Sequence, residues 1–474
     1  MKDPGAADRS SDTTNEYTNE KFFYQRRNTQ TDILKILFGT IGHFFGDFQA
    51  LFSKVKDGRV PEKITYSIPA LAFVGVLMFL CHLGARRQVS LQLRTVQSAE
   101  TLRTLFHVGA IPHGDTLNDA FKQCDPGDFQ RVVCDMGRML IRKKVLYSSR
   151  VLDKYFVVAI DGTGTVSYSK RHCPHCLTQT HNGKTIYYHK VLEAKLVTPE
   201  GFVFSLLSEF IENSGEQTGK QDCELKAFYR LAVRLKAAFP RLPIILTLDA
   251  LYACGPVFKI CRDYDWKFTI VLTDKDLPSV NEEFQALAAL EPANRLSFHT
   301  GKKCEIRQDF QWIDQILYTD SENREHTLHV IECIETKKEK QGQVTRSTWK
   351  WITNVNVSRT NVIALANNAG RMRWKIENQG FNAQKTGGYC LEHAYTTDPN
   401  AAKIFYYLLQ IAHTISQLLY NGSLLGKTGR KALGAVKNLA PRLLEAWRNA
   451  SLTKSEIDNL IHRRFQIRFC PDTS

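Results

Sequence analysis

Three carboxylates in the sequence stand where they could hold a metal ion together. Asp161 and Asp249 each follow a short apolar run, and Glu377 lies in a helical pattern among basic residues. Ligands gather at the carboxyl ends of neighbouring strands in an open α/β sheet, which would bring the two aspartates close together. Carboxylate oxygens suit Mg²⁺ or Mn²⁺ rather than zinc. The set predicts a site for a hard cation, which Glu377 would complete.

Each of these carboxylates also has a structural alternative. An aspartate that ends a strand often caps a turn, and Glu377 could form an i, i+4 ion pair with Arg373. Asp222 and Glu224 also lie in this region, in the expected first turn of a helix, where the macrodipole favours negative charge. For those two residues the helix-start interpretation is preferred.

The elements that would position these residues follow an α/β order. The segments predicted as strands are 155–160, 191–197, 202–210 and 242–248, and later 310–313, 326–334 and 349–353. An amphipathic helix is predicted over 221–239, and helices return at about Asn361. Segments 191–197 and 202–210 are separated by Pro199-Glu-Gly, which predicts a hairpin.

Three blocks of sequence resemble the catalytic motifs of insertion-sequence transposases. They are Ala159-Ile-Asp161-Gly-Thr-Gly, Thr247-Leu-Asp249-Ala-Leu-Tyr-Ala and Arg373-Trp-Lys-Ile-Glu377-Asn-Gln-Gly-Phe-Asn. The segments Lys220-Gln-Asp-Cys-Glu-Leu-Lys-Ala and Gly387-Gly-Tyr-Cys-Leu-Glu-His are also similar to such proteins. The resemblance is to DDE (Asp-Asp-Glu) transposases, closest to the insertion-sequence-four family, and it spans about 151–420.

The resemblance implies a ribonuclease H-like mixed sheet flanked by helices, with a β-rich insertion before the last catalytic helix and an N-terminal helical domain. Asp161, Asp249 and Glu377 would be the catalytic residues. Two Mg²⁺ (or Mn²⁺) ions per active site would offset the repulsion of these carboxylates and bridge the scissile phosphate. The expected domains are a disordered tail, 1–25; a helical DNA-binding or dimerisation domain, 26–150; a catalytic domain, 151–425, with its insertion at about 290–355; and a basic helical region, 426–474.

The chain departs from the family's Tyr-Arg-Glu-Lys signature at two positions. Gly370 stands where the tyrosine is expected, and Gln384 stands where the lysine is expected, with Lys385 next to it. Backbone phosphates of DNA would be held by basic residues around Glu377, contacts that position DNA without reading its sequence. The expected DNA-binding residues are Arg371, Arg373, Trp374, Lys375 and Lys385.

A Cys-x-x-Cys pair, Cys173 and Cys176, supplies half of a tetrahedral zinc site. The histidines near it are His172, His175, His181 and His189, and two of them could supply the remaining ligands. The predicted structural zinc set is Cys173, Cys176, His181 and His189. The alternative is a reduced pair of thiols in a loop beside the DNA.

Composition supports a nucleic-acid partner. The 474 residues carry 63 Lys and Arg against 48 Asp and Glu, a net charge of +15 with a pI of about 9.2. Such an excess favours a polyanion. Twelve scattered cysteines and a polar N-terminus predict a cytoplasmic protein. The resemblance to insertion-sequence transposases implies a bacterial one, associated with the nucleoid when bound to DNA. The uncharged segment 64–85 has a short apolar centre, which favours a core helix over a membrane span.

The function expected is that of a DNA transposase acting by cut and paste. It would bind double-stranded DNA at the terminal inverted repeats of its mobile element and in target DNA, as a homodimer in the synaptic complex. It would catalyse metal-dependent strand cleavage and strand transfer. The alternative is a transposase-derived DNA-binding protein without catalytic activity. A dinucleotide-binding loop is excluded because its third glycine would fall at Ser167.

Overall fold

The computed structural model of the protein describes residues 32–213, 221–301, 305–338, 343–462 and 466–469. The predicted tail, 1–25, lies outside the described residues. The chain divides into two compact units, with boundaries between residues 125 and 126 and between residues 414 and 415. The domain limits expected from sequence were 150 and 425. The observed division assigns helix α7 (Pro126–Arg142), which packs on strand β4 (Val203–Ile211), to the sheet-containing unit.

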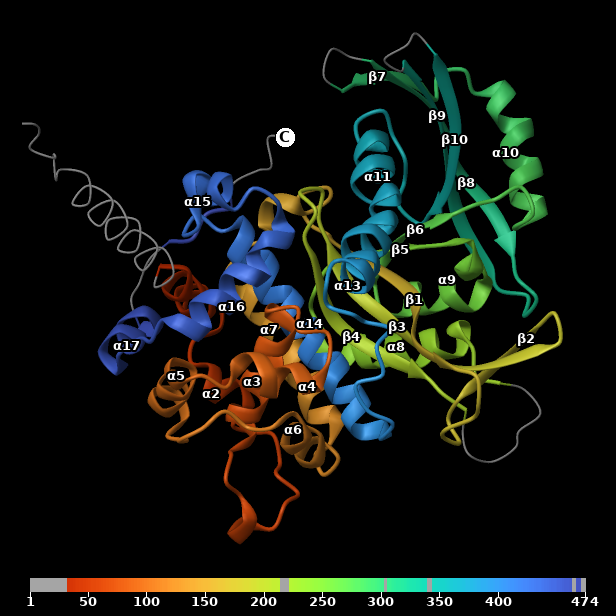
Figure 1. Cartoon of the computed structure of the whole chain (residues 1–474). Helices are drawn as coiled ribbons and strands as arrows, with labels where there is room; N and C mark the ends of the chain where they lie inside the picture. Colours follow the sequence, from red (N-terminus) through yellow and green to blue (C-terminus); the bar gives the residue numbers. More distant parts are fainter. Residues whose placement is uncertain (1–31, 214–220, 302–304, 339–342, 463–465, 470–474) are drawn as a thin grey trace, which may run out of the picture. The chain divides into compact units, whose positions relative to one another are not determined.

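The first unit is helical, and its two sequence segments come from the two ends of the chain (Figure 1). Its helices are residues 32–45, α2 (Phe48–Phe52), α3 (Ile68–Leu80), α4 (Arg86–Gln88), α5 (Val96–Phe106), α6 (Gly114–Phe121), α15 (Gly426–Leu433), α16 (Leu439–Asn449) and α17 (Lys454–His462). Helix α3 is the apolar segment noted in the sequence, and nearly every residue of it is buried. Phe73 of α3 packs against Phe106 and Trp447, so α3 is a core helix of this unit. None of the helices in the described ranges combines the length and the apolar character that crossing a bilayer requires.

The second unit is built on one mixed sheet, which confirms the expected α/β class. Its other strands are β1 (Phe156–Tyr168), β2 (Leu177–His181), β3 (Lys184–Val197), β5 (Ile244–Leu248), β6 (Lys267–Val271), β7 (Arg295–Thr300), β8 (Ile306–Thr319), β9 (Glu325–Lys338) and β10 (Val344–Thr353). The strand order is β2-β3-β1-β5-β6-β10-β9-β8-β7, with β4 paired to β3. Strands β1, β5 and β6 are parallel, whereas β3 and β4 form the predicted antiparallel hairpin.

Helices connect the parallel strands and cover the sheet. Helix α8 (Glu224–Ala238) precedes β5 and packs on β3 and β4, and α9 (Gly255–Asp263) joins β5 to β6 and packs on β6. Leu231 and Leu235 lie on the apolar stripe of α8 and are fully buried, as the helical spacing predicts. Parallel neighbours cannot be joined by a tight turn and need a crossover connection, usually a helix, as α9 is here.

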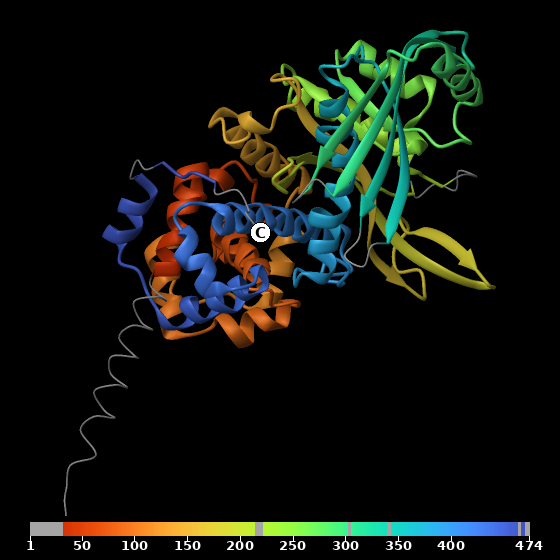
Figure 2. The ribbon, with the colours of Figure 1, turned by 90° about the horizontal axis from the view of Figure 1, so that it is seen from above.

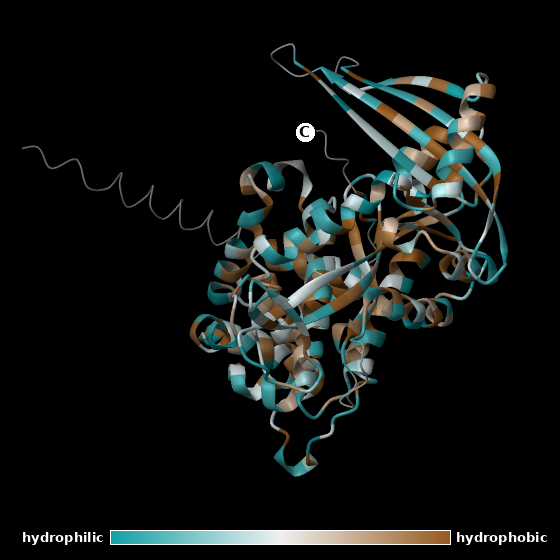
Figure 3. Ribbon diagram, turned by 90° about the vertical axis from the view of Figure 1, so that its right-hand side faces the viewer, coloured by the Kyte–Doolittle hydropathy of each residue, from teal (hydrophilic) through white to brown (hydrophobic). Residues whose placement is uncertain are grey.

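The strand-rich stretch before Glu377 is a long antiparallel extension of the sheet, β7 to β10 (Figure 2). Apolar and polar residues alternate along these strands (Figure 3), which is the pattern of strands with faces of different burial. One face packs Trp351 and Phe310 against α11 (Val362–Asn368). On the opposite face Lys350 lies over the ring of Phe284 in α10 (Pro278–Leu290).

The segment that carries Glu377 follows α11 as a series of short helical turns. These are Gly370–Met372, α12 (Arg373–Lys375), a π-helical turn, η6 (Ile376–Phe381), and α13 (Asn382–Thr386). Helix α14 (Pro399–Asn421) follows, and the unit boundary falls within it. Glu377 is therefore helical, as predicted, but in a widened turn. Such turns occur frequently at functional sites.

Candidate active site

Strand register brings Asp161 and Asp249 to the same edge of the sheet. Strands β1 and β5 pair in parallel, and the last pair is Ala159 with Thr247. Asp161 and Asp249 each lie two residues beyond that pair, so they stand side by side at the carboxyl end of the parallel strands. The sequence predicts that β1 ends at Asp161, and this is wrong. Strand β1 continues to Tyr168 because its pairing with β3 persists after β5 has ended.

Both aspartates use one oxygen for a local backbone bond. Asp161 Oδ1 accepts from the Gly162 N–H at 2.9 Å. Asp249 Oδ1 accepts from the Leu251 N–H at 3.0 Å and caps the short 3₁₀ helix Ala250–Tyr252. Asp249 therefore does cap a turn, as its structural alternative predicts. In both aspartates the backbone hydrogen bond at Oδ1 fixes the direction of the carboxylate and leaves Oδ2 for contacts in the site.

Arg373 connects the last helical segment to the first aspartate. Its Nη1 lies 3.2 Å from Oδ2 of Asp161, and its guanidinium carbon lies 4.7 Å from the ring centroid of Trp374. The ion pair expected under the structural alternative, between Arg373 and Glu377, is not the pair that forms. Arg373 instead brings the Glu377 segment to the strand that carries Asp161.

The two aspartates lie in an environment that disfavours their charged forms. Burial raises the pKa of Asp161 to about 6, and the charges of Asp249 and Glu224 also raise it, while Arg373 and the Gly162 N–H oppose the shift. Burial likewise raises the pKa of Asp249, with Glu224 adding to the effect and Arg373 opposing it. One arginine therefore does not neutralise the cluster, and a bound cation would stabilise it.

Glu377 is half-buried in η6, which packs against β1. Within the described ranges its carboxylate makes no side-chain hydrogen bond and no ion pair, although Arg373 is one turn away. No direct contact joins Glu377 to Asp161 or Asp249 in that part of the chain. Glu377 is therefore a carboxylate without a side-chain partner among the described residues, in a turn that packs on the strand of Asp161.

Sequence reasoning missed Glu224, which lies next to the two aspartates. Its carboxylate is paired with Lys190 of β3, and a Cβ at residue 162 would lie 2.6 Å from Glu224 Oε1. Gly162 is therefore needed for the close approach of Glu224. Burial and the charges of Glu224, Asp249 and Asp161 raise the pKa of Tyr252, which places its hydroxyl beside the same group. The glycine that follows Asp161 was the available clue to a close neighbour.

Three of the five expected DNA-binding residues form ion pairs within the protein. Arg373 pairs with Asp161, Arg371 pairs with Glu335 at 2.9 Å, and Lys385 pairs with Glu392 at 3.0 Å. Lys375 makes no ion pair with any described residue, and Trp374 is 44% exposed although its ring packs against Arg373 and Trp349. The structure thus separates basic residues that organise the site from those that are available to a phosphate.

Packing accounts for the residues found at positions 370 and 384, where the resemblance implies a tyrosine and a lysine. A Cβ at Gly370 would lie 2.8 Å from the indole of Trp351, and the Gly370 carbonyl accepts from Thr247 at 3.3 Å. Gln384 is fully buried and bonds to Gln410 at 2.9 Å. Both positions are structural in this chain.

Replacing Gly370 by Tyr is expected to lower the free energy of unfolding by about 1–3 kcal/mol, because the added side chain must displace the Trp351 ring. Urea denaturation measures the change. Asn378→Tyr, at an exposed position of η6, is the matched control and should change stability by less than about 0.5 kcal/mol. Equal stability of the two variants would contradict the packing argument.

The predicted zinc set is brought together in part. Cys173, Cys176 and His189 lie together, but the fourth member of the group is His172, and all four ligand atoms are within 4.8 Å of one another. His181 is wrong as a ligand: it is exposed at the tip of the β2–β3 hairpin, where it pairs with Lys184.

Comparison with known proteins bears on the region that the catalytic motifs do not cover. Residues 49–136 match the family model described as DDE_Tnp_1-associated. The matched segment is similar to this transposase-associated family. It lies N-terminal to Asp161, so it is independent of the three catalytic blocks. No curated protein matches the chain.

Proposed function

We propose that this chain is an active DDE transposase, of the insertion-sequence-four group, that cuts and joins DNA at the ends of a mobile element. The observation that carries the proposal is the juxtaposition of Asp161 and Asp249, with Arg373 reaching them from the segment that contains Glu377. The match of residues 49–136 supports a transposase-related role independently.

The sheet supports the finer assignment to a ribonuclease H-like fold. Strands β4, β3 and β1 form an antiparallel series, and β5 and β6 continue it in parallel with β1, in the order β4-β3-β1-β5-β6. Helices α8 and α9 occupy the connections before β5 and β6. Strands β7–β10 then form the insertion before the segment with Glu377.

The oxygen donors of the carboxylates suit the chemistry of the divalent cations that this function needs. Asp161 and Asp249 are partly buried with raised pKa values, and Glu377 has no partner among the described residues. Asp161, Asp249 and Glu377 would hold Mg²⁺ or Mn²⁺, two per site. When bound, these ions neutralise phosphate charge and activate water or a 3′ hydroxyl for attack.

The chain's own cations would position the DNA. Arg373 is only partly committed to Asp161, because its Nε is buried without a hydrogen-bond partner among the described residues. A phosphate near Asp161 would offer two acceptors to this guanidinium, a geometry that arginine favours. Trp374 and Lys375 on the same segment remain available for a base and a second phosphate.

The partners follow from the proposed reaction. Both ends of the element must be held together during strand transfer, so we propose a homodimer on double-stranded DNA that carries terminal inverted repeats, with target DNA bound later. The excess of positive charge, +15, suits this partner. Affinity should fall steeply as salt concentration rises.

Replacing Glu377 by Gln should abolish Mg²⁺-dependent nicking of DNA that carries the inverted repeats flanking the gene. Binding of the same DNA should stay nearly unchanged, because the variant removes a metal ligand and no basic residue. A gel assay reports cleavage, and a mobility-shift assay reports binding. The control is Glu283→Gln, an exposed carboxylate on α10.

Undiminished nicking by the Glu377 variant would overturn the assignment. The rival function, DNA binding without catalysis, predicts that the wild-type protein binds the correct ends yet leaves them intact even with Mn²⁺. The same two assays on the wild-type protein distinguish these functions.

A further inference from the structure

A second group of metal-ligating side chains lies beyond the carboxylates, and its donors are nitrogen and sulfur. We propose that His172, Cys173, Cys176 and His189 bind one structural zinc ion. Among the described residues, this is the group of histidine, cysteine and acidic side chains whose ligand atoms converge as a metal site requires.

The spacing of the donor atoms matches a single tetrahedral ion. Zinc–sulfur bonds of about 2.3 Å and zinc–nitrogen bonds of about 2.0–2.1 Å place tetrahedral ligands about 3.3–3.8 Å apart. The two sulfurs are 3.4 Å apart, and Nε2 of His189 lies 3.4 Å from Cys173 Sγ and 3.6 Å from Cys176 Sγ. The nitrogens of His172 lie 3.3 Å from Cys176 Sγ and 3.3 Å from His189 Nε2, and one of them would be the ligand.

The donor set selects the metal. Two thiolates and two imidazoles suit zinc, and they do not suit Mg²⁺, which takes oxygen ligands. An iron–sulfur cluster would need its protein ligands spread over more than one metal, whereas these four converge on one point. The sulfurs are also too far apart for a disulfide, in which they would be about 2.05 Å apart.

The ion would cross-link the connection between β1 and β2 to strand β3. His172, Cys173 and Cys176 are in the connection between β1 and β2, and His189 is in β3. Pairing of β1 with β3 is interrupted by a bulge between Gly164 and Val166, directly opposite His189. A bulge of this kind bends the strand locally and can re-aim the side chains next to it.

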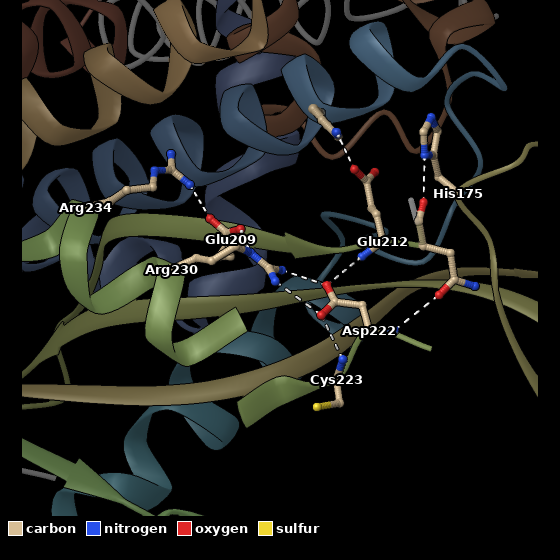
Figure 4. A network of polar contacts seen from close by, with 9 residues as sticks. His175, Glu209, Glu212, Asp222, Cys223, Arg230 and Arg234 are labelled. Carbon is tan, nitrogen blue, oxygen red and sulfur yellow. Dashed lines mark hydrogen bonds and ion pairs between the residues drawn. The ribbon is translucent and has the colours of Figure 1, made fainter. Parts of the chain in front are cut away.

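A hydrogen-bond network outside the ligands holds their loop in place (Figure 4). Asn213 donates to the Cys176 carbonyl at 2.9 Å, and the Asn213 carbonyl lies 3.0 Å from Nδ1 of His175. The Asp222 N–H donates to Asn213 at 3.2 Å, and Asp222 pairs with Arg230 at 2.6 Å. The loop is thus fixed to α8 through groups that are not ligands, which preorganises the cysteines for a metal.

The position of His189 gives the ion a structural role. The next residue, Lys190, pairs with Glu224 beside Asp161. Holding His189 fixes the middle of β3 against β1, and with it the placement of Lys190. The zinc site would therefore support the geometry of the carboxylate cluster without contacting it.

The test measures metal in the full-length protein, and it does not depend on DNA cleavage. Purified wild-type protein should contain about one zinc ion per chain by elemental analysis, and a mercurial thiol reagent should release it. After exchange with Co²⁺ the protein should show the visible absorption of tetrahedral cobalt bound to thiolates. Cys176→Ser and His189→Ala should lose the bound zinc.

Two matched variants act as controls. His181→Ala removes the neighbouring histidine outside the group, and Cys390→Ser removes a cysteine far along the chain; both should retain one zinc ion per chain. The proposal fails if wild-type protein reconstituted with zinc holds none, or if its mass shows a disulfide between Cys173 and Cys176. It also fails if His181→Ala loses the metal while His189→Ala keeps it. If the cysteine variant does not fold, the cobalt spectrum of the wild-type protein still decides.

Discussion

Replacing Glu193 by Gln is expected to lower the free energy of unfolding by about 3–5 kcal/mol, because it leaves a buried lysine without its counter-charge. Glu193 and Lys195 are fully buried on β3, with Lys195 Nζ 3.2 Å from Glu193 Oε2. Burial lowers the pKa of Lys195, and Glu193 opposes this shift. Ser205 donates to the Glu193 carboxylate at 2.7 Å, so the substitution also disturbs a hydrogen bond.

Guanidinium denaturation followed by tryptophan fluorescence measures this loss. Five of the six tryptophans lie between residues 126 and 414, so the signal reports mainly on the unit that contains Glu193. Glu200→Gln, in the exposed turn of the same hairpin, should change stability by less than about 0.5 kcal/mol.

A double variant separates charge from packing. Glu193→Gln combined with Lys195→Met removes both charges, and Met can pack on the Phe381 ring that Lys195 now covers. It should recover much of the stability lost by the single variant, since apolar replacements of buried ion pairs are often neutral or stabilising. A single variant that costs less than about 1 kcal/mol would show that the pair is not stabilising β3 in this way.

Local pattern was sufficient to predict much of the sheet but not the length of its central strand. The apolar run before Asp161 predicts a strand, and Gly162-Thr-Gly164 reads as its end. In the folded protein these residues continue to pair with β3. Glycine lowers the intrinsic preference for a strand, yet Gly162 is required here because Glu224 and Lys190 approach it closely. Long-range pairing overrides the local preference, and single-sequence patterns do not contain that information.

The proposed zinc ligands show which part of that site the sequence could have predicted. His181 is followed by Asn182-Gly183, a pair typical of a tight hairpin turn. That turn places His181 opposite Lys184 at the tip of the hairpin, away from Cys173 and Cys176. The turn could have excluded His181. The approach of His172 to His189 depends on the bulge in β1, for which the sequence offers only Gly164.

The position of Glu224 could not be predicted from its own segment. Its place in the first turn of α8 agrees with the helix-start interpretation, and the helical pattern gives no information about what faces it. Only the packing of α8 on β3 shows that Glu224 meets Lys190 beside Asp161. A residue can therefore begin a helix and also belong to the candidate site.

Replacing Asp161 by Asn is expected to abolish metal-dependent cleavage and, at pH 8 without divalent cations, to stabilise the protein by up to about 3 kcal/mol. The pKa of Asp161 is raised from 3.8 to about 6 in the folded state. Between these two values the folded state binds more protons than the unfolded state, so stability falls as pH rises. Above pH 6 the full cost of burying the carboxylate is present, and a shift of about two units corresponds to about 3 kcal/mol.

Asparagine carries no charge at any of these pH values, so the stability difference should vanish as pH approaches 4. Thermal or urea denaturation at pH 4.5 and pH 8, in the presence of a chelator, measures the change, with Glu283→Gln as the control. Equal stabilisation by Asp161→Asn at both pH values would show that the folded state does not raise the pKa of Asp161.

Added Mg²⁺ should raise the stability of the wild-type protein, because a ligand that binds only the folded state stabilises it, and should have little effect on the variant. A wild-type protein insensitive to Mg²⁺ would place the metal ions elsewhere, since Arg373 and Lys190 leave the pKa values of both aspartates raised and the pair would gain from a cation bound to it.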